Sequence, residues 1–375
     1  MNRLTSSFGS KEYERGGPLQ GVRVVEFAGL GPAPFASMLL ADMGADVVKI
    51  ERSGTKTSGM TGPIDRGRLV VHLDLKCARD LSSVMELLAA ADILIEGFRP
   101  GVMERLGLGP TDVERVNPRL IYGRMTGWGQ NGPLARSAGH DLNYIAITGA
   151  LNAIGIPGLP PVPPLNLVGD YAGGSLYLVV GLLAALFETR QSGLGQVVDA
   201  AICDGTVSLL SALMGFTARG MDNGQRGQNL LDGGCPFYSA YETSDGLFIT
   251  IAAIEPQFFG ALCERIDLPE YLRSKQNDRT VWPEMRAALT RIFASRNQAD
   301  WEALLAGTDA CFASVTPLSK APENPHLQER GTFIKCGEGW QSAPAPRLSR
   351  TPGKIRPPVN LTIDEVLTQW RATAR

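Results

Sequence analysis

The 375-residue chain lacks an excess of charge of either sign, and it has few residues suited to metal binding or disulfides. Its 36 Lys and Arg residues balance 38 Asp and Glu residues, which argues against a protein built to bind nucleic acid. The six cysteines are scattered without a CxxC pair, and there are only three histidines. We therefore expect neither a metal site nor a disulfide framework, and a protein of the reducing cytoplasm.

The sequence also lacks an apolar run long enough to span a membrane. The opening MNRLTSSFGSKEYERGG has no apolar segment of a signal peptide, and the final RATAR is no peroxisomal tripeptide. The most apolar stretch, residues 176–187, is shorter than the roughly 20 residues that cross a bilayer. We expect a buried helix there and no membrane span. With 44% apolar and 20% charged residues, the chain has the composition of an ordinary globular protein, and its length suits two domains.

Short apolar strands alternate with helical patterns through the first third of the chain. VRVVEF at 22–27 and DVVKIE at 46–51 flank the helical run FASMLLADMG, which predicts a strand–helix–strand unit with a right-handed crossover. RLVVHLDL, LSSVMELLAAA and DILIEGF continue the alternation. The pattern predicts an α/β fold whose large domain contains an open, mostly parallel, Rossmann-like sheet.

The second half of the chain has a different composition. MDNGQRGQNLLDGG at 221–234 is polar and glycine-rich, as linkers are, and PFYSAYET and LFITIAAI flank a DG turn that predicts a hairpin. Helical runs follow. We therefore expect a large domain at 1–205, a linker at 206–230, a smaller α+β domain at 231–325 and a segment at 326–375 that returns to the large domain.

The turn after the first predicted strand nearly matches a dinucleotide-binding fingerprint. It reads GLGPAP at 29–34, and Glu51 lies about where a ribose-binding acid belongs. However, Pro34 replaces the third glycine, and Pro32 and Pro34 remove two N–H donors that a pyrophosphate needs. We favour a tight turn that sets helix–sheet packing over a nicotinamide site. His72, within an apolar strand pattern, is expected to be a core histidine.

One histidine and two carboxylates fall where helices are predicted to begin. His140 directly precedes DLNYIAI, and the positive end of a helix keeps an imidazole neutral and able to accept a proton. Asp170 precedes YAGGS, where glycines allow close approach of a ligand and free N–H groups can hold an oxyanion. Glu255 precedes Pro256 and suits a helix cap. Simple capping is the alternative for Asp170 and Glu255, and spacing alone does not decide between them.

Four basic residues follow predicted strands. Arg52, Lys76, Arg99 and Arg105 lie at carboxyl ends of strands or just beyond, where open sheets bind anions and nucleotides. A solvated surface charge is the alternative for each of them.

Long segments of the sequence resemble the class III CoA-transferase superfamily. They are GVRVVEFAGLGPAPFASMLLADMGADVVKIER, ADILIEGFRPGVMERLGLGP, LIYGRMTGWGQNGPLARSAGHDLNYIAITGAL and PPLNLVGDYAGGSLYLVVGLLAALFETRQSGLGQVVDAAICDG. Within the superfamily, GHDLNY and AIEPQF resemble the α-methylacyl-CoA racemases. The similarity extends from about Pro18 to the end of the chain.

The resemblance implies a racemase that interconverts 2R- and 2S-methylacyl-CoA thioesters by removing and returning the α-proton through an enolate. It implies that His140 and Asp170 are the acid/base pair, with Glu255 hydrogen-bonded to the histidine, and an interlocked homodimer. The positions that contact the CoA portion of the substrate would be Arg52, Leu73, Lys76, Arg99, Arg105, Tyr144 and Asn166. No metal or further cofactor is implied.

Two alternatives remain open at this stage. In CoA transferases of the superfamily, the aspartate at the position of Asp170 is a nucleophile that forms a covalent anhydride. These enzymes generally lack the histidine of the GHD motif, so His140 favours racemisation. A noncatalytic CoA-binding protein is the second alternative, and it would have no need of His140.

Overall fold

The computed structural model describes residues 16–54 and 62–373. The opening stretch in which we found no signal peptide lies outside these residues, apart from Gly16 and Gly17. Contacts divide the chain into two units, which are described separately below. Unit 1 comprises the residues up to Asp141, Leu167–Gly205 and Gln341–Arg375, and unit 2 comprises Leu142–Asn166 and Thr206–Trp340.

The boundaries of these units differ from those expected in three places. Residues 142–166 cluster with unit 2 instead of the large domain, and the return to unit 1 begins at Gln341 instead of residue 326. The segment at 206–230, expected as a linker, belongs to unit 2. It contains the second half of helix α8 (Ile202–Leu209) and all of α9 (Ser211–Ala218).

Unit 1 is built on a seven-stranded sheet in the order β12-β3-β2-β1-β4-β5-β6, and every described pairing in it is parallel. The strands are β1 (Arg23–Phe27), β2 (Asp46–Arg52), β3 (Arg68–Leu73), β4 (Ile93–Glu96), β5 (Ile121–Thr126), β6 (Val197–Ala201) and β12 (Val359–Asn360). The predicted open parallel sheet is confirmed. Strand order changes direction between β1 and β4, and ligands of such sheets bind at that point, beyond the carboxyl ends of the strands.

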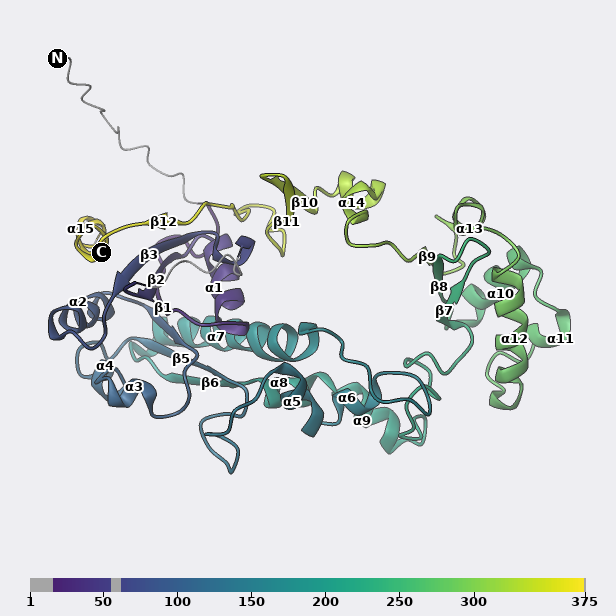
Figure 1. Cartoon of the computed structure of the whole chain (residues 1–375), viewed down its shortest axis with the longest axis horizontal. Helices are drawn as coiled ribbons and strands as arrows, with labels where there is room; N and C mark the ends of the chain where they lie inside the picture. Colours follow the sequence, from purple (N-terminus) through teal and green to yellow (C-terminus); the bar gives the residue numbers. More distant parts are fainter. Residues whose placement is uncertain (1–15, 55–61, 374–375) are drawn as a thin grey trace, which may run out of the picture. The chain divides into compact units, whose positions relative to one another are not determined.

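Helices cover both faces of this sheet. On one face, α2 (Ala78–Ala89) and α15 (Ile363–Ala372) bury Leu87, Val366 and Trp370 in a core with Val25 and Val48 of the strands. On the other face, α1 (Pro32–Asp42) and α7 (Tyr177–Ser192) lie next to one another (Figure 1). Two short helices, α3 (Val102–Arg105) and α4 (Pro110–Glu114), follow β4.

A helix of unit 1 is longer and more exposed than the sequence predicted. The π-helical segment η2 (Leu167–Leu176) runs directly into α7, so 26 residues form one helix that is apolar enough to cross a membrane by length and composition alone. The helix predicted at 176–187 is confirmed, but it is only partly buried, since Val180 and Phe187 are 65% and 68% exposed. Core helices of globular proteins meet the same criteria, and this one contacts α1, β5 and β6, so no membrane span is indicated.

Unit 2 contains a three-stranded antiparallel sheet with helices beside it. The predicted hairpin is confirmed: β7 (Tyr238–Glu242) pairs with β8 (Phe248–Ala252), which pairs in turn with β9 (Phe312–Ser314). The sheet shares a core with α10 (Pro256–Ile266), α12 (Trp282–Phe293) and α13 (Gln298–Leu305). Other helices of this unit are α5 (Asp141–Ile147), which begins at the last residue of unit 1, α6 (Ala150–Ala153), α11 (Glu270–Arg273) and α14 (Pro325–Glu329). Strand β10 (Phe333–Cys336) pairs with β11 (Gly339–Ser342), whose last two residues belong to unit 1.

Candidate active site

Asp170 lies in the first turn of η2, and this segment is attached closely to the start of α1. π-Helical segments are rare and occur frequently at functional sites. A Cβ atom added to Gly174 of η2 would lie 3.2 Å from the Cβ atom of Pro32, which is closer than most Cβ contacts in proteins. The hydroxyl oxygen of Ser175 lies 2.7 Å from the carbonyl oxygen of Pro32 and 3.0 Å from that of Asp170, so its single proton bridges the two acceptors. The backbone of Asp170 is thereby tied to the first residue of α1.

The side chain of Asp170 faces the turn that follows β1. Gly31 has φ 73° and ψ −118°, which L-residues avoid, and its missing Cβ would lie 3.1 Å from Oδ2 of Asp170. The next residue along η2, Tyr171, stacks on Phe35 of α1 with ring centroids 4.5 Å apart. The turn resembling a dinucleotide fingerprint thus serves helix packing, as expected, and in addition it accommodates a carboxyl group.

Asp141, the residue directly after His140, contacts the backbone of Asp170. Its Oδ1 accepts a hydrogen bond from the N–H of Asp170 at 2.6 Å, and the residue is only 9% exposed. Burial raises the pKa of the Asp141 carboxyl, against the effect of hydrogen bonds from the N–H groups of Asp170 and Gly169. Because α5 begins at Asp141, His140 stands immediately before the helix, as predicted, and its side chain is exposed.

This contact removes one of the N–H groups that we expected to be free. We expected free N–H groups near Asp170 to hold an oxyanion, but the N–H of Asp170 itself is already taken by Asp141. Asp141 was missed in the sequence because an acidic residue in the first turn of a helix is ordinarily a cap. Its one distinguishing signal is its place beside His140.

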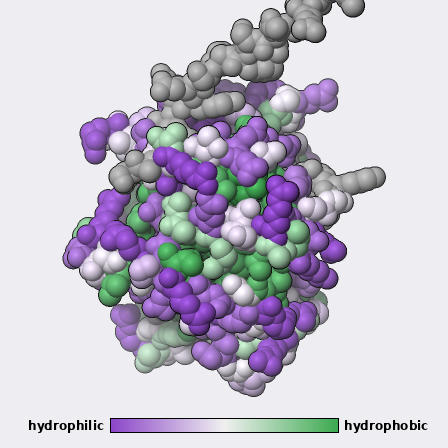
Figure 2. Space-filling view, turned by 90° about the vertical axis from the view of Figure 1, so that its left-hand side faces the viewer, coloured by the Kyte–Doolittle hydropathy of each residue, from purple (hydrophilic) through white to green (hydrophobic). Residues whose placement is uncertain are grey.

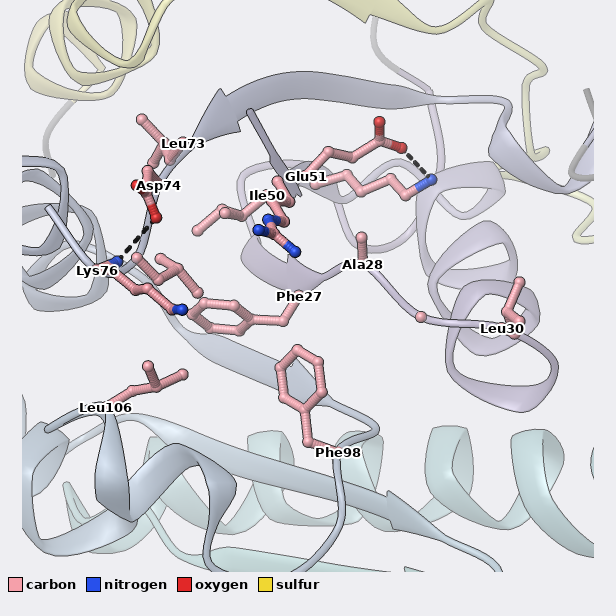
Figure 3. Close-up of a pocket in the computed structure, with 14 residues that line it drawn as sticks. Phe27, Ala28, Leu30, Ile50, Glu51, Leu73, Asp74, Lys76, Phe98 and Leu106 are labelled. Carbon is pink, nitrogen blue, oxygen red and sulfur yellow. Dashed lines mark hydrogen bonds and ion pairs between the residues drawn. The ribbon is translucent and has the colours of Figure 1, made fainter. Parts of the chain in front are cut away.

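A cavity of about 460 Å³ opens at the carboxyl ends of β1, β2 and β3 (Figure 3). The lining residues are Phe27, Ala28, Gly29, Leu30, Lys49, Ile50, Glu51, Arg52, Leu73, Asp74, Leu75, Lys76, Phe98 and Leu106. Phe27 and Phe98 lie edge to face, with ring centroids 6.4 Å apart. Figure 2 views the side on which these strands end, and it shows apolar residues grouped in the middle of the face with hydrophilic residues around them. An apolar cavity with a few charged groups suits a ring system that carries phosphates.

The cavity brings together three of the predicted CoA-binding residues. Arg52, Leu73 and Lys76 line it. Arg99 and Arg105 are not among its lining residues, although their chain neighbours Phe98 and Leu106 are. Phe27, Phe98 and Leu106 could not be predicted as lining residues, because an apolar residue at a strand end or in a helix is ordinarily part of the core.

Two ion pairs fix the segment that carries Arg99 and Arg105. Nε of Arg124 lies 3.0 Å from Glu96, at the end of β4, and its Nη1 lies 2.9 Å from Glu104 of α3. Glu96 is fully buried, and its second carboxylate oxygen accepts the N–H of Phe98 at 2.7 Å. Burial raises the pKa of Glu96 despite these favourable contacts.

Lys49 and Glu51 of β2 line the cavity and form an ion pair, and His72 of β3 lies beside Glu51. Glu51 forms an ion pair with Lys49 at 2.7 Å, and Lys49 also contacts Asp65 at 2.9 Å. The residue in the position of a ribose-binding acid is therefore engaged with a buried lysine. The prediction that His72 is a core residue is wrong: its side chain is 37% exposed, and Nδ1 lies 3.9 Å from Glu51.

The other predicted site residues, Tyr144, Asn166 and Glu255, belong to unit 2. Tyr144 lies in α5, and Asn166 is the last residue before η2. Glu255 occupies the N-cap position of α10 with Pro256 following it, as expected, but its exposed side chain accepts no capping hydrogen bond. Capping by the side chain therefore does not account for a glutamate at this position. Within residues 16–54 and 62–373, no group of three or more His, Cys, Asp or Glu side chains is arranged to hold a metal ion.

Comparison with known proteins places this chain in one family. The sequence model of CoA-transferase family III matches residues 19–359. Alpha-methylacyl-CoA racemases of Mus musculus and Homo sapiens are 43% and 42% identical over 357 residues, which cover 94% of this chain and 93% of each relative.

Solved structures agree with the sequence comparison. A CAIB/BAIF family protein from Brucella suis superposes with a TM-score of 0.79 at 26% identity, over 96% of this chain and 99% of that one. Rv3272 from M. tuberculosis gives a TM-score of 0.78 at 28% identity, over 94% of this chain and 99% of that one. The chain therefore belongs to CoA-transferase family III, and within that family it is similar over nearly its whole length to the alpha-methylacyl-CoA racemases.

Proposed function

We propose that this protein is a racemase that interconverts the 2R and 2S epimers of 2-methylacyl-CoA thioesters. The observation that carries the proposal is the hydrogen bond between Asp141 and the N–H of Asp170, because it ties the residue after His140 to the second candidate base. The names of the relatives that are 42–43% identical support the same reaction. No cofactor is required beyond the CoA that forms part of the substrate.

Racemisation needs two bases on opposite sides of one carbon, one protonated and one not, which exchange roles after each turnover. His140 directly precedes α5 and supplies one of these two groups. Asp170 supplies the second group. In the proposed reaction one of them removes the α-proton, the thioester becomes an enolate, and the other returns a proton to the opposite face. In the proposed homodimer, Glu255 of the partner subunit would hydrogen-bond His140 and orient its ring.

The cavity at the ends of β1, β2 and β3 would hold the nucleotide of CoA. Its apolar walls, which include Phe27 and Phe98, suit the adenine ring, while Arg52 and Lys76 carry the charges that phosphates require. In this proposal Arg99, Arg105, Tyr144 and Asn166 complete the contacts with CoA.

We further propose that the enzyme is an interlocked homodimer of the cytoplasm. The described residues of a single chain include 27 exposed large apolar side chains, and 17 of these fall between Leu142 and Leu231. Such a concentration supports the dimer, because exposed apolar surface marks protein–protein contacts. The location is supported by the six cysteines, all of which are free.

Incubation with a pure 2R- or 2S-methylacyl-CoA in D₂O tests the reaction. We expect deuterium at C2 and formation of the other epimer without any added carboxylate. Product formation that requires a free carboxylate acceptor would instead indicate a CoA transferase with Asp170 as nucleophile. A protein that shows neither activity would be a CoA-binding protein without catalysis. The variants His140→Ala and Asp170→Ala should slow exchange most strongly from opposite epimers, and equal losses from both epimers would contradict separate base roles.

A further inference from the structure

We propose that Asp141 is a positioning residue for racemisation, whose carboxylate fixes the backbone of Asp170 and so sets the spacing between the two bases. The inference rests on the proposed function. It concerns a side chain that does not itself exchange a proton with the substrate.

The hydrogen bond from the N–H of Asp170 to the carboxylate of Asp141 restrains the backbone of Asp170. N–H groups in the first turn of a helix have no partner within the helix, and Asp170 is the fourth residue of η2. Its N–H lies 2.6 Å from Oδ1 of Asp141, and bonds to a carboxylate are shorter and stronger than bonds between neutral groups. Asp141 is 9% exposed, so water competes little for this bond.

The chain by itself does not keep His140 near Asp170. Between them it leaves unit 1 at Leu142 and returns at Leu167. Asp141 bridges this interval, because it is bonded covalently to His140 and by a hydrogen bond to the backbone of Asp170. On the other side of Asp170, the Ser175 hydroxyl binds its carbonyl oxygen and Gly31 faces its carboxyl group. Loss of the Asp141 carboxylate therefore removes the hydrogen bond that links the backbone of Asp170 to the residue next to His140.

Exchange and inversion respond differently to such a loss. Exchange of the α-proton with solvent needs one correctly placed base, whereas inversion needs both bases aligned across the same carbon. A misplacement of about 1 Å can cost roughly 100-fold in rate. A change in the spacing of the bases should therefore slow inversion more than it slows exchange.

The experiment compares Asp141→Ala and Asp141→Asn with the matched variant Asp92→Ala. Oδ2 of Asp92 accepts the N–H of Arg23 at 2.8 Å, which is the same kind of bond at the amino ends of β4 and β1. For each protein, C2 deuterium incorporation and inversion are measured on the same 2-methylacyl-CoA, together with the melting temperature and the circular dichroism spectrum.

We expect Asp141→Ala to lower the ratio of inversion to exchange by at least about tenfold, with inversion itself reduced about 100-fold. Asp141→Asn keeps one acceptor oxygen and should lower the ratio less. Asp92→Ala should lower the melting temperature and leave the ratio unchanged. If Asp141→Ala does not fold, the ratio of inversion to exchange in Asp141→Asn tests the positioning role.

If a folded Asp141 variant had the same ratio of inversion to exchange as the wild type, the positioning role would be wrong, even if the melting temperature fell. A wild-type protein that neither exchanges nor inverts the substrate would refute the proposed function and this inference together. Racemisation by the wild type with an unchanged ratio in the variants refutes only the role of Asp141.

Discussion

Replacing Gly31 by alanine tests whether the turn after β1 sets the position of the Asp170 carboxyl. Gly31 has φ 73° and ψ −118°, a conformation that costs an L-residue about 1–3 kcal/mol. In a unit of roughly 200 residues, each kcal/mol lowers the melting temperature by about 2–4 °C, so we expect a decrease of about 2–12 °C.

The same substitution should also affect catalysis. The added Cβ would lie 3.1 Å from Oδ2 of Asp170, so the carboxyl must move by a few tenths of an ångström. If 1 Å costs roughly 100-fold, such a displacement costs about three- to tenfold in the rate of inversion.

A matched control separates the strain from the displacement. Gly246, in the turn between β7 and β8, also has φ +73°, but a Cβ atom there would meet no atom within 4 Å. Gly246→Ala should therefore lower stability without changing the inversion rate per folded molecule. Thermal melts and the D₂O assay measure both properties. If Gly31→Ala lost no more activity than Gly246→Ala, the position of Asp170 would not depend on this turn.

Three further predictions concern other parts of the molecule. Glu26→Ala leaves Arg68 buried without the carboxylate that lies 3.0 Å from it, and should cost about 3–5 kcal/mol in urea unfolding, whereas a double change of both residues to Met should cost much less. Burial raises the pKa of Cys235 and of Cys263 to about 12, so at pH 8 their thiols should react with a thiol reagent only after unfolding, and labelling at the rate of the exposed cysteines would contradict this. Glu255→Gln should slow exchange without raising the Kd for CoA, and a parallel loss of affinity would argue against an orienting role.

The sequence predicted the sheet of unit 1 well because its strands are local signals. Buried parallel strands such as β1 and β2 are apolar runs bounded by turns, and such runs can be recognised without knowledge of their neighbours. β12 could not be found in this way, since Val359 and Asn360 form a strand only through pairing with Leu69 and Val70.

The division into units depends on contacts between distant residues, which the sequence does not display. Residues 142–166 join unit 2 because Arg226, 60 or more positions further along, donates hydrogen bonds to the carbonyl oxygens of Asn152 at 2.8 Å and Leu159 at 2.6 Å. A Gly/Pro-rich loop gives no local indication of the unit to which it belongs.

The candidate site was predictable to the extent that its chemistry is unusual for its place. Charged residues at the ends of apolar strands, such as Arg52, stand out and do line the cavity. Phe27 in the same cavity could not be told from a core residue, and Asp141 could not be told from a helix cap. Their roles depend on which groups lie opposite them in space.

The insertion of unit 2 within the sequence of unit 1 has a consequence for synthesis on the ribosome. All of unit 2 has been translated by Trp340, but unit 1 still lacks Gln341–Arg375. That segment supplies the edge strand beside β3, and it supplies Trp370, which is 2% exposed in the core shared with α2. A nascent chain can therefore fold unit 2 first. Until β12 has been made, the β3 edge of the sheet of unit 1 is unpaired and can associate with other chains. Unit 1 therefore begins first on the ribosome, but its sheet and core are completed only when Gln341–Arg375 have been translated.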